Sequence, residues 1–140
     1  MNIRPYRAAD RDAVIALWQA CGLTRPWNDP AGDIAFCTGR PESTILVGEA
    51  QDGGSLIATV MVGHDGHRGW LYYLGVDPAA QKAGHGRAMV AAAESWLAAR
   101  GVPKVMLMVR PENDRVRAFY AALGYIVEER LIFSRRLDGK

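Results

Sequence analysis

The sequence has few cysteines, little net charge and no long hydrophobic run. Its two cysteines, Cys21 and Cys37, show neither CxxC spacing nor histidines at zinc-binding intervals, so no disulfide framework and no metal site are predicted. The net charge of +2 lacks the cationic excess of a nucleic-acid or membrane-surface binder, and we expect neither partner. Charges and glycines interrupt every apolar run, and residues 1–12 contain no signal-peptide core, which predicts a cytoplasmic protein.

The sequence also lacks internal repeats and low-complexity linkers. Its 140 residues are 49% hydrophobic, and the apolar pattern continues almost to the last residue. A chain of this length buries roughly two thirds of its unfolded surface on folding, which is enough for one core without a staple. We therefore expect a single domain over residues 1–140.

Hydrophobic periodicity predicts alternating helices and strands. Strands are expected over residues 2–7, 44–49, 56–62, 70–76 and 105–109, with a final strand pair or bent strand over about 125–137. Helices are expected after an N-cap at Asp10, over about 30–39 behind Asp29, over about 84–100, and after Asn113 or Asp114. An antiparallel meander joined to a strand–helix–strand crossover predicts an α/β fold (α+β by another convention), with a mixed sheet and helices on both faces.

One strand-to-helix turn lies in the segment YLGVDPAAQKAGHGRAMV, residues 73–90. Gly84 and Gly86 precede and open the helix there, and a helix N-terminus presents free N–H groups and a positive dipole end that bind anions. Lys82 and Arg87 add positive charge. The spacing matches neither the GxGxxG nor the P-loop pattern. The turn therefore indicates either a phosphate site of another kind or an ordinary connector.

The same turn resembles the signature V-x-P-x-x-[Q/R]-x-x-G-x-G/A of GNAT N-acetyltransferases, through Val76, Pro78, Gln81, Gly84 and Gly86. Farther along, FYAALGY at residues 119–125 resembles the family's (F/L)-Y-x-x-L-G-(F/Y) helix end, and Asn113 its Asn after the fifth strand. The resemblance covers essentially the whole chain. The segments LWQACGLTRPWNDP and GHDGHRG look similar to YpeA-type bacterial acetyltransferases.

The resemblance implies the GNAT fold, with a mostly antiparallel sheet of six to seven strands whose central parallel strands splay apart. It implies acetyl-CoA as the cofactor, with the pantetheine arm paired to the backbone of Leu74, Gly75 and Val76. The pyrophosphate is then expected on the turn formed by Gln81, Lys82, Ala83, Gly84, His85, Gly86 and Arg87. Asn113 is expected to hydrogen-bond the cofactor arm.

By the same resemblance, Tyr120 lies beside the thioester sulfur as the general acid for the departing thiolate, in an acetyl transfer to a primary amine by direct attack. Periodicity alone favours a packing role for Tyr120 and a helix-capping role for Asn113. Related ribosomal-protein acetyltransferases carry a Glu where this chain has Met108, so no general base is assigned. Glu49, Asp65, His67 and Glu112 stay open as bases or as exposed loop residues.

The family builds its acceptor sites from the loop between the first two helices, which implies that Arg25, Trp27, Asn28 and Asp29 bind the amine. The alternative is that this segment only caps a helix and buries Trp27. We expect a small-molecule or peptide amine as the acceptor, and a homodimer is left open by a strand edge near the C-terminus. The competing function is a catalytically inactive CoA-sensing or protein-binding module on the same fold.

Overall fold

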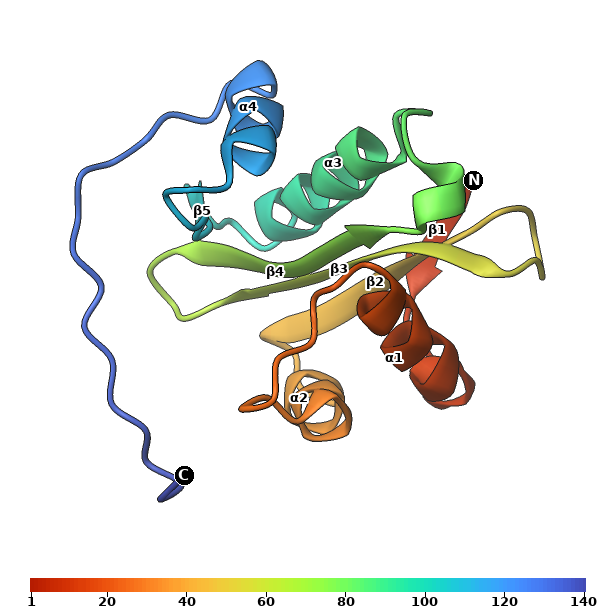
Figure 1. Ribbon diagram of the computed structural model, residues 1–140, viewed down its shortest axis with the longest axis horizontal. Helices are drawn as coiled ribbons and strands as arrows, with labels where there is room; N and C mark the ends of the chain where they lie inside the picture. The colour runs from red at the N-terminus through yellow and green to blue at the C-terminus, as the bar shows by residue number, and fades with distance from the viewer. The chain divides into compact units, whose positions relative to one another are not determined.

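The computed structural model describes all residues from 1 to 140, and they form two compact units, Met1–Leu107 and Met108–Lys140. The first unit contains the β-sheet and helices α1 to α3, and the second contains helix α4 and the C-terminal segment (Figure 1). None of the helices is both long enough and apolar enough to cross a lipid bilayer.

The sheet of the first unit has five strands in the order β1-β2-β3-β4-β5. The strands are β1 Asn2–Pro5, β2 Ser43–Glu49, β3 Leu56–His64, β4 Gly69–Val76 and β5 Val105–Met106. Neighbours from β1 to β4 are antiparallel, and β5 is parallel to β4. The predicted α/β fold with a mixed, mostly antiparallel sheet is confirmed.

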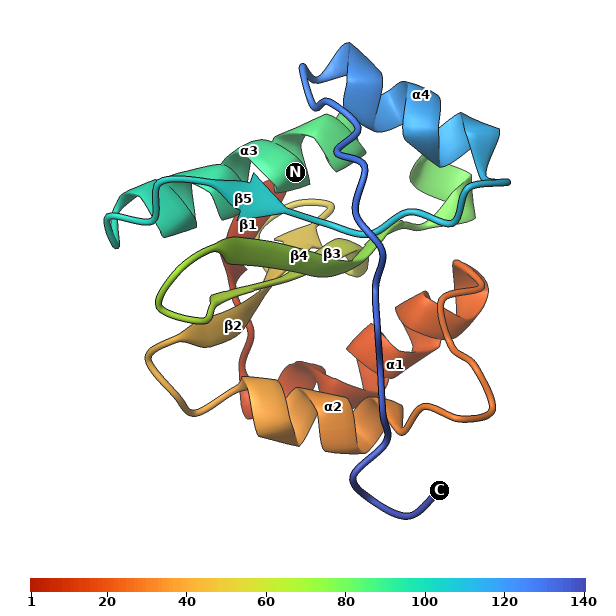
Figure 2. The ribbon, with the colours of Figure 1, turned by 90° about the vertical axis from the view of Figure 1, so that its left-hand side faces the viewer.

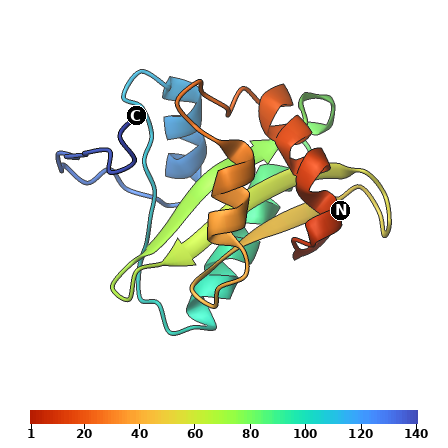
Figure 3. The same cartoon turned by 90° about the horizontal axis from the view of Figure 1, so that it is seen from below.

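Helices cover both faces of this sheet. They are α1 Arg11–Ala20, α2 Pro30–Cys37 and α3 His85–Ala98. Viewed from below, α1 and α2 lie in front of the sheet and α3 lies behind it (Figure 3). Each long helix buries one stripe at helical spacing, as an amphipathic helix on a sheet does. The buried stripes are Val14, Leu17 and Trp18 in α1, and Met89, Val90, Ala93 and Leu97 in α3.

The core under α1 is tied together by Trp18, which is fully buried. Its indole stacks on the ring of Tyr73 with 3.8 Å between centroids, and its Nε1 donates to Thr59 Oγ1 at 3.1 Å. The Thr59 hydroxyl donates in turn to the backbone oxygen of Tyr73, also at 3.1 Å. The indole N–H and the Thr59 hydroxyl are both hydrogen-bonded, which offsets the cost of burying these polar groups between α1, β3 and β4.

The predicted strand pair over residues 125–137 is wrong, and the sheet has five strands instead of six to seven. The segment is rich in β-branched and aromatic residues, which fit a pleated surface. A strand, however, is defined by ladder hydrogen bonds to a partner, and a propensity pattern does not specify that partner. The predicted strand over 105–109 shortens to β5 for a related reason, because only two of its residues pair with β4.

The sequence predicts that Asp10 caps the first helix, and this prediction is wrong. Asp10 directly precedes α1, but its side chain makes no hydrogen bond to the N-terminus of that helix. It accepts instead from the Arg4 guanidinium at 2.8 and 2.9 Å and from the Arg7 backbone N–H at 2.8 Å. Arg4 also pairs with Glu49 of β2 at 3.0 Å. The hydrogen bonds from Arg4 lower the pKa of the Asp10 carboxyl below its ordinary value.

The substitution Asp10→Asn should lower the free energy of unfolding by about 1.5–3 kcal/mol at pH 7, because it removes charged hydrogen bonds at a nearly buried site. A depressed pKa stabilises the fold above the ordinary Asp value of 3.8, and this contribution is lost as the pH falls through the lower folded-state value. Urea denaturation at pH 7, 4 and 3 checks both statements.

The matched control is Asp12→Asn, because Asp12 lies in the same region with its side chain 89% exposed. It should leave the unfolding free energy nearly unchanged. A deficit of Asp10→Asn that stayed constant as the pH fell would contradict the assigned role of the carboxylate.

Candidate active site

The two parallel strands separate almost as soon as they meet. Gly69 pairs with Val105 and Trp70 pairs with Met106, and β5 ends there (Figure 2). The strand β4 continues to Val76 with β3 on one side and no strand on the other. The expected splay of the central parallel strands is confirmed. It leaves a row of backbone groups on the outer edge of β4 that an extended ligand can pair with.

A β-bulge interrupts β4 on this stretch. Thr59 pairs with Gly75 and Met61 pairs with Tyr72, so the single residue between them on β3 faces two residues on β4. One of the two, Tyr73, has a φ of +52°, in the left-handed region that residues with a side chain seldom adopt. Such a bulge bends the strand and redirects its backbone groups, and bulges are frequent beside active sites.

Two contacts hold Tyr73 in this conformation. Its ring stacks on Trp18, and its hydroxyl donates to Asp33 Oδ2 of α2 at 2.7 Å. Burial and the bond to Asp33 raise the pKa of the Tyr73 hydroxyl, so it stays a donor at every physiological pH. The strained residue is therefore clamped from α1 and from α2 together.

The loop between α1 and α2 is anchored to β4 near its start. Cys21 Sγ donates to the backbone oxygen of Val76 at 3.2 Å. A Cβ on Gly75 would lie 3.0 Å from Leu23 Cδ1 and 3.1 Å from Cys21 Sγ, which is tighter than an ordinary van der Waals contact, so glycine at this position lets the loop approach the strand closely. Asp33 holds the far side of the loop through Tyr73. The loop therefore runs beside the bulged part of β4.

The predicted acceptor residues lie together in this loop. Arg25 Nη1 donates to the backbone oxygen of Gly22 at 2.8 Å, and the Asn28 N–H donates to the backbone oxygen of Arg25 at 3.0 Å. Asp29 caps α2 by accepting from the Gly32 N–H at 3.1 Å. Trp27 is 56% exposed, so the segment does cap a helix but does not bury its indole.

The predicted phosphate turn leads from β4 into α3. Gln81, Lys82, Ala83, Gly84 and Arg87 are exposed there, and His85 and Gly86 are half-buried. Gly84 is the N-cap of α3 with a φ of +80°, and it provides no side chain to cap the helix. The first N–H groups of α3 therefore face outward, with the positive end of the helix dipole behind them.

The carbonyl of Val76 at the end of β4 is already engaged. It accepts from Gln81 Nε2 at 3.1 Å as well as from Cys21 Sγ. Gln81 therefore has a positioning function, since it fixes the turn against the last residue of the strand.

Asn113 and Tyr120 lie in the second unit. Asn113 Oδ1 caps α4, Asp114–Ala122, by accepting from the Val116 N–H at 3.2 Å. Tyr120 is 9% exposed and makes edge-to-face contacts with Phe119 and Tyr125, at centroid distances of 5.0 and 5.4 Å. Burial raises the pKa of its hydroxyl to about 12, so the phenol is protonated at neutral pH.

Two of the four residues considered as a general base, Glu49 and Asp65, are hydrogen-bonded to other groups of the protein. Glu49 accepts from Asn2 Nδ2 and pairs with Arg4. Asp65 accepts from the backbone N–H groups of His67 and Arg68, and these bonds lower its pKa to about 2. Both carboxylates hold local structure, and neither is poised to accept a proton near pH 7.

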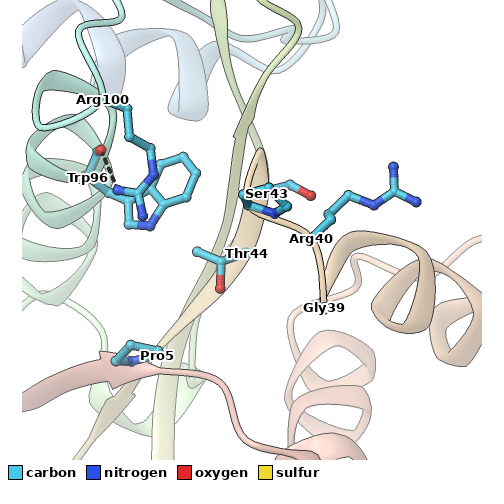
Figure 4. Close-up of a pocket in the computed structure, with 8 residues that line it drawn as sticks. Pro5, Gly39, Arg40, Ser43, Thr44, Trp96 and Arg100 are labelled. Carbon is cyan, nitrogen blue, oxygen red and sulfur yellow. Dashed lines mark hydrogen bonds between the residues drawn. The ribbon is translucent and has the colours of Figure 1, made fainter.

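A separate cavity of about 350 Å³ opens elsewhere on the first unit (Figure 4). It is lined by Pro5, Gly39, Arg40, Pro41, Ser43, Thr44, Trp96 and Arg100. The Arg100 guanidinium lies 3.5 Å from the centroid of the Trp96 ring and donates to the Trp96 backbone oxygen at 2.9 Å. None of the residues predicted for cofactor or acceptor binding lines this cavity, so it is not the candidate active site.

Comparison with known proteins decides the family. The model of the acetyltransferase (GNAT) family matches residues 9–125. The chain belongs to this family. Acetyltransferases of Yersinia enterocolitica and Pectobacterium atrosepticum are 41% and 43% identical to it over 137 residues, which is 98% of this chain and 96% of each relative. The family predicted from the sequence is confirmed, and the protein is an acetyltransferase.

Solved structures share the fold of this acetyltransferase. The aminoglycoside N-acetyltransferase AAC(6')-Iy in complex with CoA matches with a TM-score of 0.83 at 19% identity, over 97% of this chain and 94% of that one. The aminoglycoside 6'-N-acetyltransferase AAC(6')-IG of Acinetobacter haemolyticus matches with a TM-score of 0.80 at 18% identity, over 99% and 100% of the two chains.

The sequence did not identify the residues that support the candidate site, which are Tyr73, Asp33 and Cys21. Tyr73 stands directly before the predicted pantetheine positions, but nothing in the local pattern indicates its φ or its bond to Asp33. The bond from Cys21 to Val76 spans 55 residues. Contacts of this range follow from packing, and a single sequence contains no local signal for them.

Proposed function

We propose that this acetyltransferase transfers the acetyl group of acetyl-CoA to a primary amine, by direct attack of the amine in a ternary complex. The observation that carries the proposal is the open edge of β4, which ends at a turn leading into the uncapped N-terminus of α3. The two features follow one another along the chain, as the extended arm and the pyrophosphate do in CoA. The neighbour of the same fold that was solved with CoA supports this cofactor.

The outer edge of β4 would hold the pantetheine arm. Backbone groups of Leu74, Gly75 and Val76 would pair with the amides of the arm as with an added strand. The fit rests on this structure, since β5 ends after two pairs and no strand competes for that edge. Asn113 would donate through its amide nitrogen, because its Oδ1 already caps α4.

The turn before α3 would hold the pyrophosphate. The outward N–H groups at His85, Gly86 and Arg87 lie at the positive end of the helix dipole. Positive charge comes from the exposed side chains of Lys82 and Arg87. Glycine at position 84 provides the left-handed φ that opens the turn, and exposed Ala83 adds no bulk.

The chemical step needs a neutral amine, which first forms a C–N bond to the acetyl carbon; the C–S bond then breaks, and the proton that the nitrogen loses goes to the departing thiolate or to solvent. A backbone N–H of Leu74 or Val76 would stabilise the oxyanion between these events. Tyr120 would donate to the departing sulfur. A phenol with a pKa of about 12 is a weaker acid than a thiol, whose pKa is near 8.5, so Tyr120 would act mainly by stabilising the thiolate.

The acceptor would bind on the loop that runs beside β4. Trp27 offers an exposed apolar wall, and Arg25, Asn28 and Asp29 offer polar groups around it. One neighbour was solved with the bisubstrate analogue CoA-S-monomethyl-acetylneamine, and others are named aminoglycoside acetyltransferases. These names support a small-molecule amine as the acceptor of this chain.

Gly84→Val should weaken acetyl-CoA binding by about tenfold or more, because valine resists the φ of +80° and its branches crowd the amides at the phosphate site. Calorimetric titration measures the change. Gly101→Val is the matched control, since Gly101 follows the other end of α3 with a φ of +75° and equally open space. Equal losses in the two variants would show a general effect of strain and remove the assigned phosphate site.

Tyr120→Phe should keep acetyl-CoA binding within about twofold and lower kcat by about 10²-fold or more, because only the hydroxyl is removed. Steady-state kinetics with a saturating amine acceptor, together with titration, separate the two effects. Tyr125→Phe, which alters a neighbouring ring in contact with Tyr120, should leave kcat unchanged. A chemistry-limited kcat that survived in Tyr120→Phe would overturn the assignment.

Trp27→Ala should raise the KM for the acceptor by about tenfold and leave the affinity for acetyl-CoA unchanged, since it removes an apolar wall of the acceptor site alone. Phe36→Ala serves as the control, because Phe36 is an exposed aromatic residue of α2 outside the loop. A loss of cofactor affinity with an unchanged acceptor KM would relocate the acceptor site.

A further inference from the structure

The cavity beside Trp96 and Arg100 lies on the α3 face of the sheet, near the edge formed by β1 and β2. Side chains alternate along β2, and Ile45 and Val47 belong to the core under α1 and α2. Thr44 therefore points to the opposite face, and Figure 4 shows it directed toward the helix that carries Trp96. Helix α3 packs chiefly against β3 and β4. The cavity forms where this helix leaves the start of β2 and the end of β1 uncovered.

The Arg100 guanidinium is held in a fixed orientation at this cavity. It stacks 3.5 Å from the centroid of the Trp96 ring, and its Nη1 donates to the Trp96 backbone oxygen at 2.9 Å. The N–H donors of a guanidinium lie in its plane, so the stack occupies its face and the bond occupies one donor. No carboxylate forms an ion pair with Arg100 in the structure. The remaining donors are therefore fixed in direction and available to an acceptor.

The charge around the cavity is positive. None of the residues that line it is acidic, and Glu42, which lies between two of them in the sequence, is exposed and does not line it. Arg40 adds a second cation at the rim, where its guanidinium lies 4.3 Å from the centroid of the Phe36 ring. Figure 4 shows this side chain directed away from Trp96, so it supplies charge without a direct contact. The C-terminal end of α3 contributes about half a negative charge, which the two arginines outweigh.

The rest of the cavity offers one hydroxyl and apolar surface. The Thr44 hydroxyl reaches only the Ile45 backbone oxygen, at 3.5 Å, which is the limit of a hydrogen bond. The Ser43 hydroxyl is already engaged, since it donates to the Cys37 backbone oxygen at 2.6 Å. The apolar surface comes from Pro5, Pro41 and the Trp96 indole. The volume of about 350 Å³ is near the lower end of the range for small-molecule sites, which is roughly 300–1,000 Å³.

We propose that this cavity is a second ligand site of the acetyltransferase, separate from the acetyl-CoA site, and that it binds a small organic carboxylate. The two carboxylate oxygens accept in-plane hydrogen bonds from Arg100, and the Thr44 hydroxyl is a further donor. The apolar body of the ligand lies against Trp96 and Pro5. A carboxylate matches the fork of one guanidinium, whereas a phosphate dianion carries more negative charge than this one arginine neutralises.

Benzoate is the probe for this site, and the indole N–H signal of Trp96 in a proton–nitrogen NMR correlation spectrum reports on the cavity. The variant Trp96→Phe assigns that signal by removing it. The titration is run at constant ionic strength with CoA present, so that the turn before α3 does not offer a competing anion site. We expect a saturable shift of the Trp96 signal with benzoate. Benzamide, which has nearly the same shape without the charge, should bind about tenfold more weakly or less.

Substitutions test the named contacts. Arg100→Gln should weaken benzoate binding by about tenfold or more, because glutamine keeps a polar side chain but lacks the charged fork. Thr44→Val should weaken it by about two- to fivefold, since it removes one neutral donor and keeps the shape of the side chain. Arg11→Gln is the matched control, because Arg11 lies on α1 at the other face of the sheet with its side chain 59% exposed. It should bind benzoate as the wild type does.

Three results would overturn the proposal: no saturable shift of the Trp96 signal, equal binding of benzamide and benzoate, or an unchanged affinity in Arg100→Gln. A shift confined to the indole signal of Trp27 would contradict it as well, because it would place benzoate at the acceptor loop. Inorganic phosphate that bound more tightly than benzoate, reported by the same Trp96 signal, would overturn the assignment to a carboxylate.

Discussion

The structure of the site depends on one strained residue that the core holds in place. Tyr73 sits at the bulge of β4 with a left-handed φ, and it stays there because Trp18 stacks on its ring and Asp33 accepts from its hydroxyl. Strain of this kind costs of order 1–3 kcal/mol and persists only where the surroundings enforce it. Here residues of α1 and α2 both enforce it. The same two helices flank the loop that starts near Cys21, whose Sγ donates a hydrogen bond to the backbone oxygen of Val76.

The N-terminus of α3 completes this arrangement from the other end of β4. Asp29 and Asn113 cap α2 and α4 with side-chain oxygens, whereas Gly84 leaves the amides of α3 open to an anion. The cost of an uncapped helix is offset when a ligand supplies the missing acceptors. The same strand thus ends in a backbone edge suited to amides and a turn suited to phosphates, which is the order of groups in CoA.

Much of this could be predicted from the sequence, because the elements have strong local patterns. The meander, the long helix before Gly101 and the cap at Asp29 follow from periodicity and turn chemistry. The prediction of strands over 125–137 is wrong because strand propensity does not specify a partner. The prediction that Asp10 caps α1 is wrong because Arg4, six residues away, competes for its carboxylate. The contacts that hold Tyr73 could not be predicted from the sequence, because they join residues far apart in the chain.

The most direct test of the account is a calorimetric titration of the protein with acetyl-CoA, free CoA and a bare adenine nucleotide at one fixed salt concentration. If the edge of β4 holds the pantetheine arm, acetyl-CoA and CoA should bind saturably with similar affinity, and the nucleotide should bind far more weakly. Binding of the nucleotide as tight as that of CoA would show that the arm contributes nothing. No binding of acetyl-CoA to the folded protein would contradict the account altogether.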